Sequence, residues 1–324
     1  MTHRWQPRCP PPAGLVTPRP VDVDGRLGPT KAQARGPYWR RTSPGLYVPI
    51  GVSCVVVEQR ILEAAQRLPP GGAVSGWAAL RMAGGGFFDG LEPDGRTPWP
   101  VRLVVPPDRN LRVVGHVVVG RERLEASEIV TLHGVPCTTP LRATFDEARG
   151  CSSLREAVVA VDMALAAGLI TLEEFRAYAN RRRGWPGARM ARAAAALADP
   201  RSLSPGETRM RLVWVLDARR PPPLCNWPIA DLSGQRLGKP DLLSDELGVA
   251  GEYNGADHRT ATRHARDVAR EGMFRNAGLE YFTVVGPDQF DIPLVLDRIN
   301  ATCHRALTAR RPRGWLIARD PGPP

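Results

Sequence analysis

Lys239-Pro240-Asp241-Leu242-Leu243 and Gly251-Glu252-Tyr253-Asn254-Gly255 are the two stretches that decide the fold of the C-terminal third of this chain. Each places one carboxylate beside apolar or aromatic residues, which favours strands, and the residues between them predict a turn at 244–247. Glu252 follows Asp241 by eleven residues, so adjacent strands would bring both carboxylates to one sheet end. Such a pair suits a hard cation, Mg²⁺ or Mn²⁺, whose remaining waters supply a nucleophile. We therefore expect Asp241 and Glu252 to be metal ligands.

The residues around this pair predict an α/β domain over 200–324. Apolar spacing alternates between the helical period and short β-branched runs. The expected order is a helix at 205–219, strands at 227–231, 241–243 and 248–253, a helix at 261–277, a strand at 281–285 and a helix from 294 to about 310. A helix, a three-strand meander and then helix–strand–helix implies a mixed sheet flanked by helices on both faces.

Pro240-Asp241 and Glu252 resemble the PD-(D/E)xK nucleases, in which a Pro-Asp and a Glu-x-Lys on adjacent strands hold the metal. Asn254 stands where that pattern has Lys. The run from Glu252 to Thr260, with residues 278–284, is similar to the Vsr-type mismatch endonucleases and their actinobacterial relatives. The resemblance implies a restriction-endonuclease-like fold, metal-dependent DNA cleavage and His258 as general base.

The chemistry of His258 agrees with that role, because an imidazole titrates near neutrality and can take a proton from water. The alternative is a surface histidine without a role. A local rival also exists, since Asn254-Gly255 is a typical type I′ hairpin turn. The residues that follow, 257–261, do not alternate as a strand would and lead into the predicted helix instead.

Glu207 is a candidate third carboxylate, reaching the metal from the first helix as in nucleases of this class. Ser204-Pro205-Gly206-Glu207 is also an S-x-x-E capping box, which explains the residue without chemistry. Three arginines recur at helical spacing after Thr260 and predict a phosphate-facing stripe or, equally, a solvated face: Arg263, Arg266 and Arg270.

The charge of the whole chain makes a polyanion, above all DNA, the expected partner. The formal net charge is +11 and the pI about 10.1. Lys31 and Lys239 are the only lysines, so a GC-rich coding bias toward arginine is the alternative explanation. The six cysteines form no CxxC pair, no apolar run reaches transmembrane length, and no signal-peptide core is visible, so we expect a cytoplasmic protein away from the membrane.

The rest of the chain predicts three further segments. Residues 1–28, rich in Pro, Arg and Gly, are expected to be a disordered leader. Residues 29–83 contain a basic hairpin at 38–49 that suits a winged-helix wing, where Arg40 and Arg41 would contact DNA, followed by helices at 55–68 and 75–82. Residues 84–199 are expected to be a small α/β domain, in which the β-branched runs at 101–105, 113–119 and 129–132 predict a small sheet.

The front part of the chain resembles AbiEi-type antitoxins of type IV toxin–antitoxin systems. The likeness rests on the hairpin segment and on 162–171, Asp-Met-Ala-Leu-Ala-Ala-Gly-Leu-Ile-Thr. It implies a DNA-binding winged helix and a cognate toxin as partner, although the helices expected before the wing are short or missing, so the winged helix is degenerate.

Three functions follow from these patterns. The first is a Mg²⁺-dependent DNA endonuclease with Asp241, Glu252, His258 and Glu207 at its site. The second is a non-catalytic, antitoxin-like DNA-binding regulator with a decayed nuclease fold, which Asn254 favours. The third is an interaction module that binds no nucleic acid. The oligomeric state has no signature in the sequence.

Overall fold

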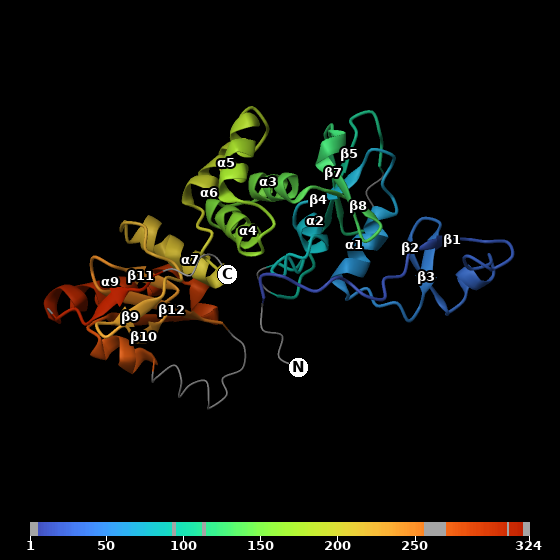
Figure 1. The fold of residues 1–324 in the computed structure, drawn as a ribbon. Coiled ribbons are helices and arrows are strands. Elements are labelled where there is room, and N and C mark those ends of the chain that lie inside the picture. Colours follow the sequence, from blue (N-terminus) through green and yellow to red (C-terminus); the bar gives the residue numbers. More distant parts are fainter. Residues whose placement is uncertain (1–5, 93–94, 112–114, 256–269, 310, 320–324) are drawn as a thin grey trace. The chain divides into compact units, whose positions relative to one another are not determined.

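The computed structural model describes residues 6–92, 95–111, 115–255, 270–309 and 311–319. It divides into two compact units, each of mixed α/β structure (Figure 1). None of the helices within these ranges combines the length and the apolar character needed to cross a membrane.

The two units are built from interleaved parts of the chain. The N-terminal unit comprises Gln6–Ser152 and Ala167–Ala196, while the C-terminal unit takes Ser153–Ala166 and the residues from Leu197 onward. The expected separation of 29–83 from 84–199 is therefore not seen. The reason is that both segments contribute strands to one sheet, and that one helix of the middle segment packs in the C-terminal unit.

A five-stranded sheet of order β6-β5-β4-β8-β7 forms the centre of the N-terminal unit. Its pairs are antiparallel except for the parallel pairs β4–β8 and β5–β6. The β-branched runs at 101–105 and 129–132 are strands as expected. The strands are β4 (Ala73–Ser75), β5 (Val101–Val105), β6 (Val117–Arg121), β7 (Ile129–Leu132) and β8 (Val135–Thr138).

Two helices of this unit begin at residues whose side chains cap them. The Thr139 hydroxyl accepts a hydrogen bond from the Arg142 amide with Pro140 in the first turn, and Thr171 and Glu174 form a reciprocal capping box. The helices are α1 (Val57–Ala65), α2 (Trp77–Met82), α3 (Pro140–Gly150), α5 (Leu172–Arg181) and α6 (Ala188–Leu197).

The predicted basic hairpin is present as β2 (Trp39–Ser43) and β3 (Leu46–Pro49), with a left-handed Gly45 in the turn. Only a short 3₁₀ turn, Gln33–Arg35, precedes it within the basic segment.

The expectation of a disordered leader fails for its described part, residues 6–28. Arg19–Pro20 forms β1 against β3. The Gln59 amide also exchanges two hydrogen bonds with the backbone of Val16, at 2.9 and 2.8 Å. The segment has no regularly spaced apolar residues, and these hydrogen bonds to the buried Gln59 side chain hold it in place.

The C-terminal unit contains two three-stranded sheets rather than one meander. β11 pairs antiparallel with β12, and β12 pairs parallel with β13, so this sheet is mixed as expected. β9 joins β10 and β14 instead of β11, because the chain reverses at Gly234. The strands are β9 (Ile229–Asp231), β10 (Arg236–Gly238), β11 (Leu242–Ser244), β12 (Val249–Asn254), β13 (Glu280–Val285) and β14 (Trp315–Ile317).

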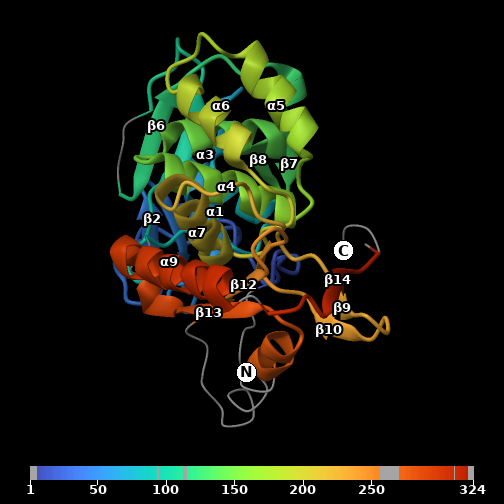
Figure 2. The ribbon, with the colours of Figure 1, turned by 90° about the vertical axis from the view of Figure 1, so that its left-hand side faces the viewer.

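Side chains that alternate along the mixed sheet enter two apolar cores. Leu242 and Val249 pack against α7 (Pro205–Leu212), the π-helical turn Val213–Asp217 and α9 (Ile292–Ala309), which lies along β12 and β13 (Figure 2). Their neighbours Leu243 and Ala250 point the other way, toward Phe274 of the helical residues 270–276 and Trp315 of β14.

α4 (Leu154–Ala166) packs on α7 through a buried polar contact. The Asp162 carboxylate accepts hydrogen bonds from the Thr208 hydroxyl and the Arg211 guanidinium, at 2.9 and 2.6 Å. Asp162 and Thr208 are fully buried, and Arg211 is 5% exposed. This pairing holds α4 in the C-terminal unit.

Candidate functional site

The strand register brings Asp241 and Glu252 opposite one another. Leu242 pairs with Gly251 across β11 and β12, so the next pair outward is Asp241 with Glu252. Directly opposite residues of an antiparallel pair have their side chains on the same face, about 5 Å apart at Cβ. The turn expected at 244–247 connects these strands, and the two carboxylates lie at the strand ends away from it.

Asp241 is the electrostatic centre of this group. Its Oδ2 accepts a hydrogen bond from the Tyr253 amide at 2.7 Å. Burial raises the pKa of Asp241 well above its ordinary value, and the nearby carboxylates of Glu207 and Glu252 raise it further. The structure therefore brings together the three carboxylates singled out from the sequence.

Glu252 is 6% exposed and forms an ion pair with Arg270, with 2.8 Å between Oε1 and Nη2. The same nitrogen donates to the Lys239 carbonyl at 2.6 Å, so the guanidinium bridges the helical residues 270–276 to the chain just before Asp241. Arg270, expected to contact phosphate, is instead engaged with a carboxylate of the candidate site.

Glu207 makes one of the two hydrogen bonds of the predicted capping box, and its carboxylate contacts other groups. Its amide donates to the Ser204 hydroxyl at 3.2 Å, which confirms the cap. Its carboxylate accepts from the Leu203 amide at 2.9 Å and from the Asn226 side chain at 2.7 Å. Burial raises the pKa of Glu207, while these bonds and the charge of Lys239 oppose the rise.

Tyr253 joins the strand to α7, a role that its sequence position did not indicate. A methyl group added at Gly206 would lie 2.1 Å from the ring, so α7 is pressed directly on it. The Tyr253 hydroxyl accepts from the Gln289 amide at 2.9 Å, and Gln289 in turn accepts from Arg209 at 2.9 Å. Tyr253 therefore fixes the backbone that supports Asp241.

The donor chemistry fits a divalent cation held by Asp241 and Glu252. Both offer hard carboxylate oxygens at one strand end, and the pKa of Asp241 is raised first by burial and then by neighbouring negative charge, which a cation would neutralise. Within the described residues no group of three or more His, Cys, Asp or Glu side chains is arranged as a metal site. Glu207, held by its own hydrogen bonds, is thus peripheral to the pair.

The remaining predicted residues fall into two groups. His258, Arg263 and Arg266 lie outside the described residues. Arg40 makes a bidentate ion pair with Glu63 of α1, at 2.7 and 3.0 Å, so it ties the hairpin to the helix.

Arg41 is exposed on the hairpin, and its Nε donates to the Ser43 carbonyl. The Arg41 side chain therefore lies on the surface of the hairpin.

The rival interpretation, a hairpin turn at Asn254-Gly255, concerns a reversal into the residues that follow, and these lie outside the described residues. β12 itself pairs parallel with β13, with Asn254 opposite Val285.

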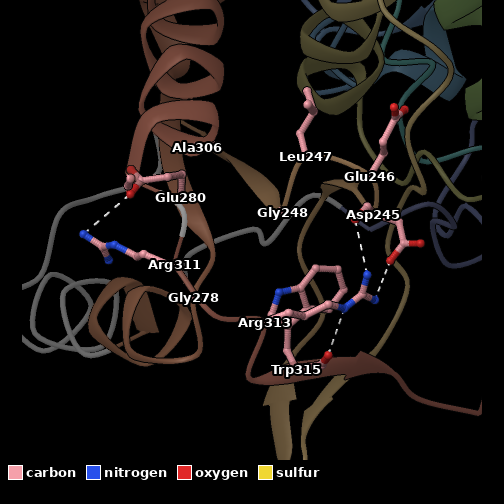
Figure 3. Close-up of a pocket in the computed structure, with 11 residues that line it drawn as sticks. Asp245, Glu246, Leu247, Gly248, Gly278, Glu280, Ala306, Arg311, Arg313 and Trp315 are labelled. Atoms are coloured by element: carbon pink, nitrogen blue, oxygen red, sulfur yellow. Dashed lines mark hydrogen bonds and ion pairs between the residues drawn. The ribbon is translucent and has the colours of Figure 1, made fainter.

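A cavity of about 140 Å³ lies at the opposite end of the mixed sheet from the carboxylates (Figure 3). Arg313 stacks over Trp315 at 3.9 Å and pairs with Asp245 at 2.6 Å. Arg311 lies 3.6 Å from Glu280 on the other wall. Each of these two arginines therefore faces a carboxylate at the cavity wall.

Comparisons with known proteins add little to this geometry. No family model matches the chain, and a search of curated proteins gave no significant match. A solved structure, the RV2827C protein from Mycobacterium tuberculosis, is similar over 58% of this chain and 67% of its own, with 15% identity and a TM-score of 0.33.

Proposed function

We propose that this chain is a metal-dependent DNA phosphodiesterase whose centre is the Asp241–Glu252 pair. The observation that carries the proposal is the placement of Asp241 opposite Glu252 at one strand end, where burial and then the carboxylates of Glu207 and Glu252 raise the pKa of Asp241. Carboxylates that raise one another's pKa are costly in a folded protein and are characteristic of sites that bind a cation or move protons. The positive charge of the chain suits a nucleic-acid substrate.

Asp241 and Glu252 would hold Mg²⁺ or Mn²⁺. The bound ion would supply Lewis acidity to a phosphodiester and a nucleophilic water, with the P–O bond broken as the water oxygen adds to phosphorus. The Tyr253 amide orients Asp241, and Arg270 positions Glu252. His258, the general base implied by the Vsr-type resemblance, would take the proton of the water.

The test pairs calorimetric titration of Mn²⁺ with plasmid nicking in wild type, Asp241→Asn and Asp245→Asn. Asp245 is a matched control, because it is an exposed carboxylate in the β11–β12 turn with its own partner, Arg313. We expect binding and nicking in wild type and in Asp245→Asn and neither in Asp241→Asn. Absence of Mn²⁺ binding by the wild type would refute the metal site.

One observation favours a second function, a non-catalytic DNA-binding regulator of the antitoxin-like kind. Arg270 already supplies a positive charge to Glu252 at 2.8 Å, which is how a decayed metal site would be neutralised. A regulator would bind its promoter in a salt-sensitive manner without cleaving it. Binding without nicking, together with no response to Mn²⁺, would select this function.

A further inference from the structure

We propose that the groove between α5 and α6 binds the sugar-phosphate backbone of duplex DNA. The α5–α6 groove is defined by Arg176 and Asn180 on α5 and by Arg189 and Arg192 on α6, and its other lining residues are alanines. Its volume is about 430 Å³. α5 and α6 lie side by side in Figures 1 and 2, and the Arg176 Nε donates to the Ala195 carbonyl at 3.1 Å across the groove.

The charge of this region is one-sided. Residues 175–198 contain six arginines and no aspartate or glutamate. One of the six, Arg182, pairs with Glu128, which lies outside this segment. Since the segment itself contains no carboxylate side chain, its own charge is strongly positive.

The groove arginines are available to a ligand. Arg176, Arg189 and Arg192 are all exposed, and none of them forms an ion pair with a residue in the described ranges. Maintaining three like charges along one groove disfavours the free protein, and an anion relieves that repulsion. A guanidinium presents two parallel donors that match phosphate oxygens.

The floor of the groove identifies the kind of anion. Four alanines, Ala179, Ala193, Ala195 and Ala196, line it between the arginines. Small apolar side chains allow close approach of a deoxyribose, while arginines on both helices meet successive phosphates. These contacts carry no base information, so the surface binds DNA independently of sequence and positions the duplex.

The experiment measures fluorescence anisotropy of a labelled 30-base-pair duplex with the full chain, in EDTA, over a salt series. For Arg189→Gln/Arg192→Gln we expect the slope of log K against log salt to fall by about 1.8, because each lost phosphate contact removes about 0.9. If wild type and variant bind with the same affinity at 1 M salt, the variant binds about 60-fold more weakly than wild type at 0.1 M salt. Arg189→Lys/Arg192→Lys should keep most of the slope.

The charge-matched control is Arg109→Gln/Arg305→Gln, which removes two exposed arginines that already face Asp108 and Glu280. It should retain the wild-type slope. Equal losses in both double variants would overturn the groove as the binding surface, and so would binding to anionic lipid vesicles but not to DNA. Thermal unfolding of each variant checks that the fold is intact.

Because EDTA removes divalent cations, this test is independent of the proposed nuclease. A protein that binds through the groove and fails to nick DNA refutes only the phosphodiesterase. A protein that nicks DNA but shows an unchanged salt slope in Arg189→Gln/Arg192→Gln refutes only the groove.

Discussion

Gly206→Ala is the substitution that most directly tests how α7 positions the candidate site. The added methyl group would lie 2.1 Å from Cζ and 2.2 Å from Cε1 of Tyr253. Ordinary carbon contacts are about 3.5–4 Å, so the ring or the helix must move by roughly 1.5 Å. The ring is held at both ends, by Gln289 at its hydroxyl and by Asp241 at its backbone amide.

The expected cost combines two opposing effects. Overpacking of this kind destabilises by about 1–3 kcal/mol, whereas replacing a helical glycine with alanine stabilises by about 0.5–1 kcal/mol. Urea unfolding of Gly206→Ala should therefore show a net loss of roughly 0.5–2 kcal/mol. Because the Tyr253 amide supports Asp241, affinity for Mn²⁺ should fall in the same variant.

Gly272→Ala is the matched control, since Gly272 lies in the helical residues 270–276 and a methyl group there meets no atom of the described residues within 4 Å. It should stabilise by about 0.5–1 kcal/mol. In a Tyr253→Leu background, which removes the clashing ring atoms, Gly206→Ala should cost nothing further. If Gly206→Ala is as stabilising as Gly272→Ala, the close packing of α7 on Tyr253 is refuted.

Two further predictions concern buried carboxylates. Asp162→Ala leaves the Arg211 guanidinium buried without its partner, so the free energy of unfolding should fall by about 3–5 kcal/mol. The control is Glu156→Ala, whose partner Arg209 is more exposed, and its loss should be under about 1 kcal/mol. Equal losses of the two variants in urea unfolding would contradict this prediction. A cation competes with a proton for the Asp241 carboxylate, whose pKa is raised by burial and by the neighbouring carboxylates, so the rise in melting temperature caused by Mn²⁺ should grow as the pH increases. A rise independent of pH would place the ion elsewhere.

Without cation, the same raised pKa sets the sign of the pH dependence of stability. A carboxyl group whose pKa is higher in the folded than in the unfolded chain binds its proton more tightly when folded. The contribution of this group to the free energy of unfolding is complete at pH values below its pKa in the unfolded chain. It is lost as the pH rises through its pKa in the folded chain. For Asp162 that folded pKa is about 6, and for Asp241 it is raised well above 3.8.

The sequence was sufficient for features that depend on local periodicity. The strands at 101–105, 129–132 and 281–285, the hairpin at 38–49 and the Ser204 cap all follow from residue alternation or capping chemistry. The pairing of Asp241 with Glu252 also followed, because a short turn between two strands leaves few possible registers.

Features that depend on contacts between distant residues were not accessible in this way. β14 is only three residues long, and its partner β9 lies over 80 residues earlier in the chain. From its place in the sequence α4 belongs to the middle segment. Its packing in the C-terminal unit depends on the contact of Asp162 with Arg211, which lies 49 residues later. Arg270 has the spacing of a phosphate contact, and only its 2.8 Å distance to Glu252 shows the different role.

The charges around Asp241 explain how the protein without cation and the proposed site with cation are related. Three carboxylates, Glu207, Asp241 and Glu252, face two cations, Arg270 and Lys239. If all were ionised, one negative charge would stay uncompensated, which agrees with the raised pKa of Asp241, whose first cause is burial and whose next causes are the two neighbouring carboxylates. A divalent cation would compensate this charge and compete with Arg270 for Glu252. The ion pair is therefore the contact whose opening decides between a working nuclease and a neutralised scaffold.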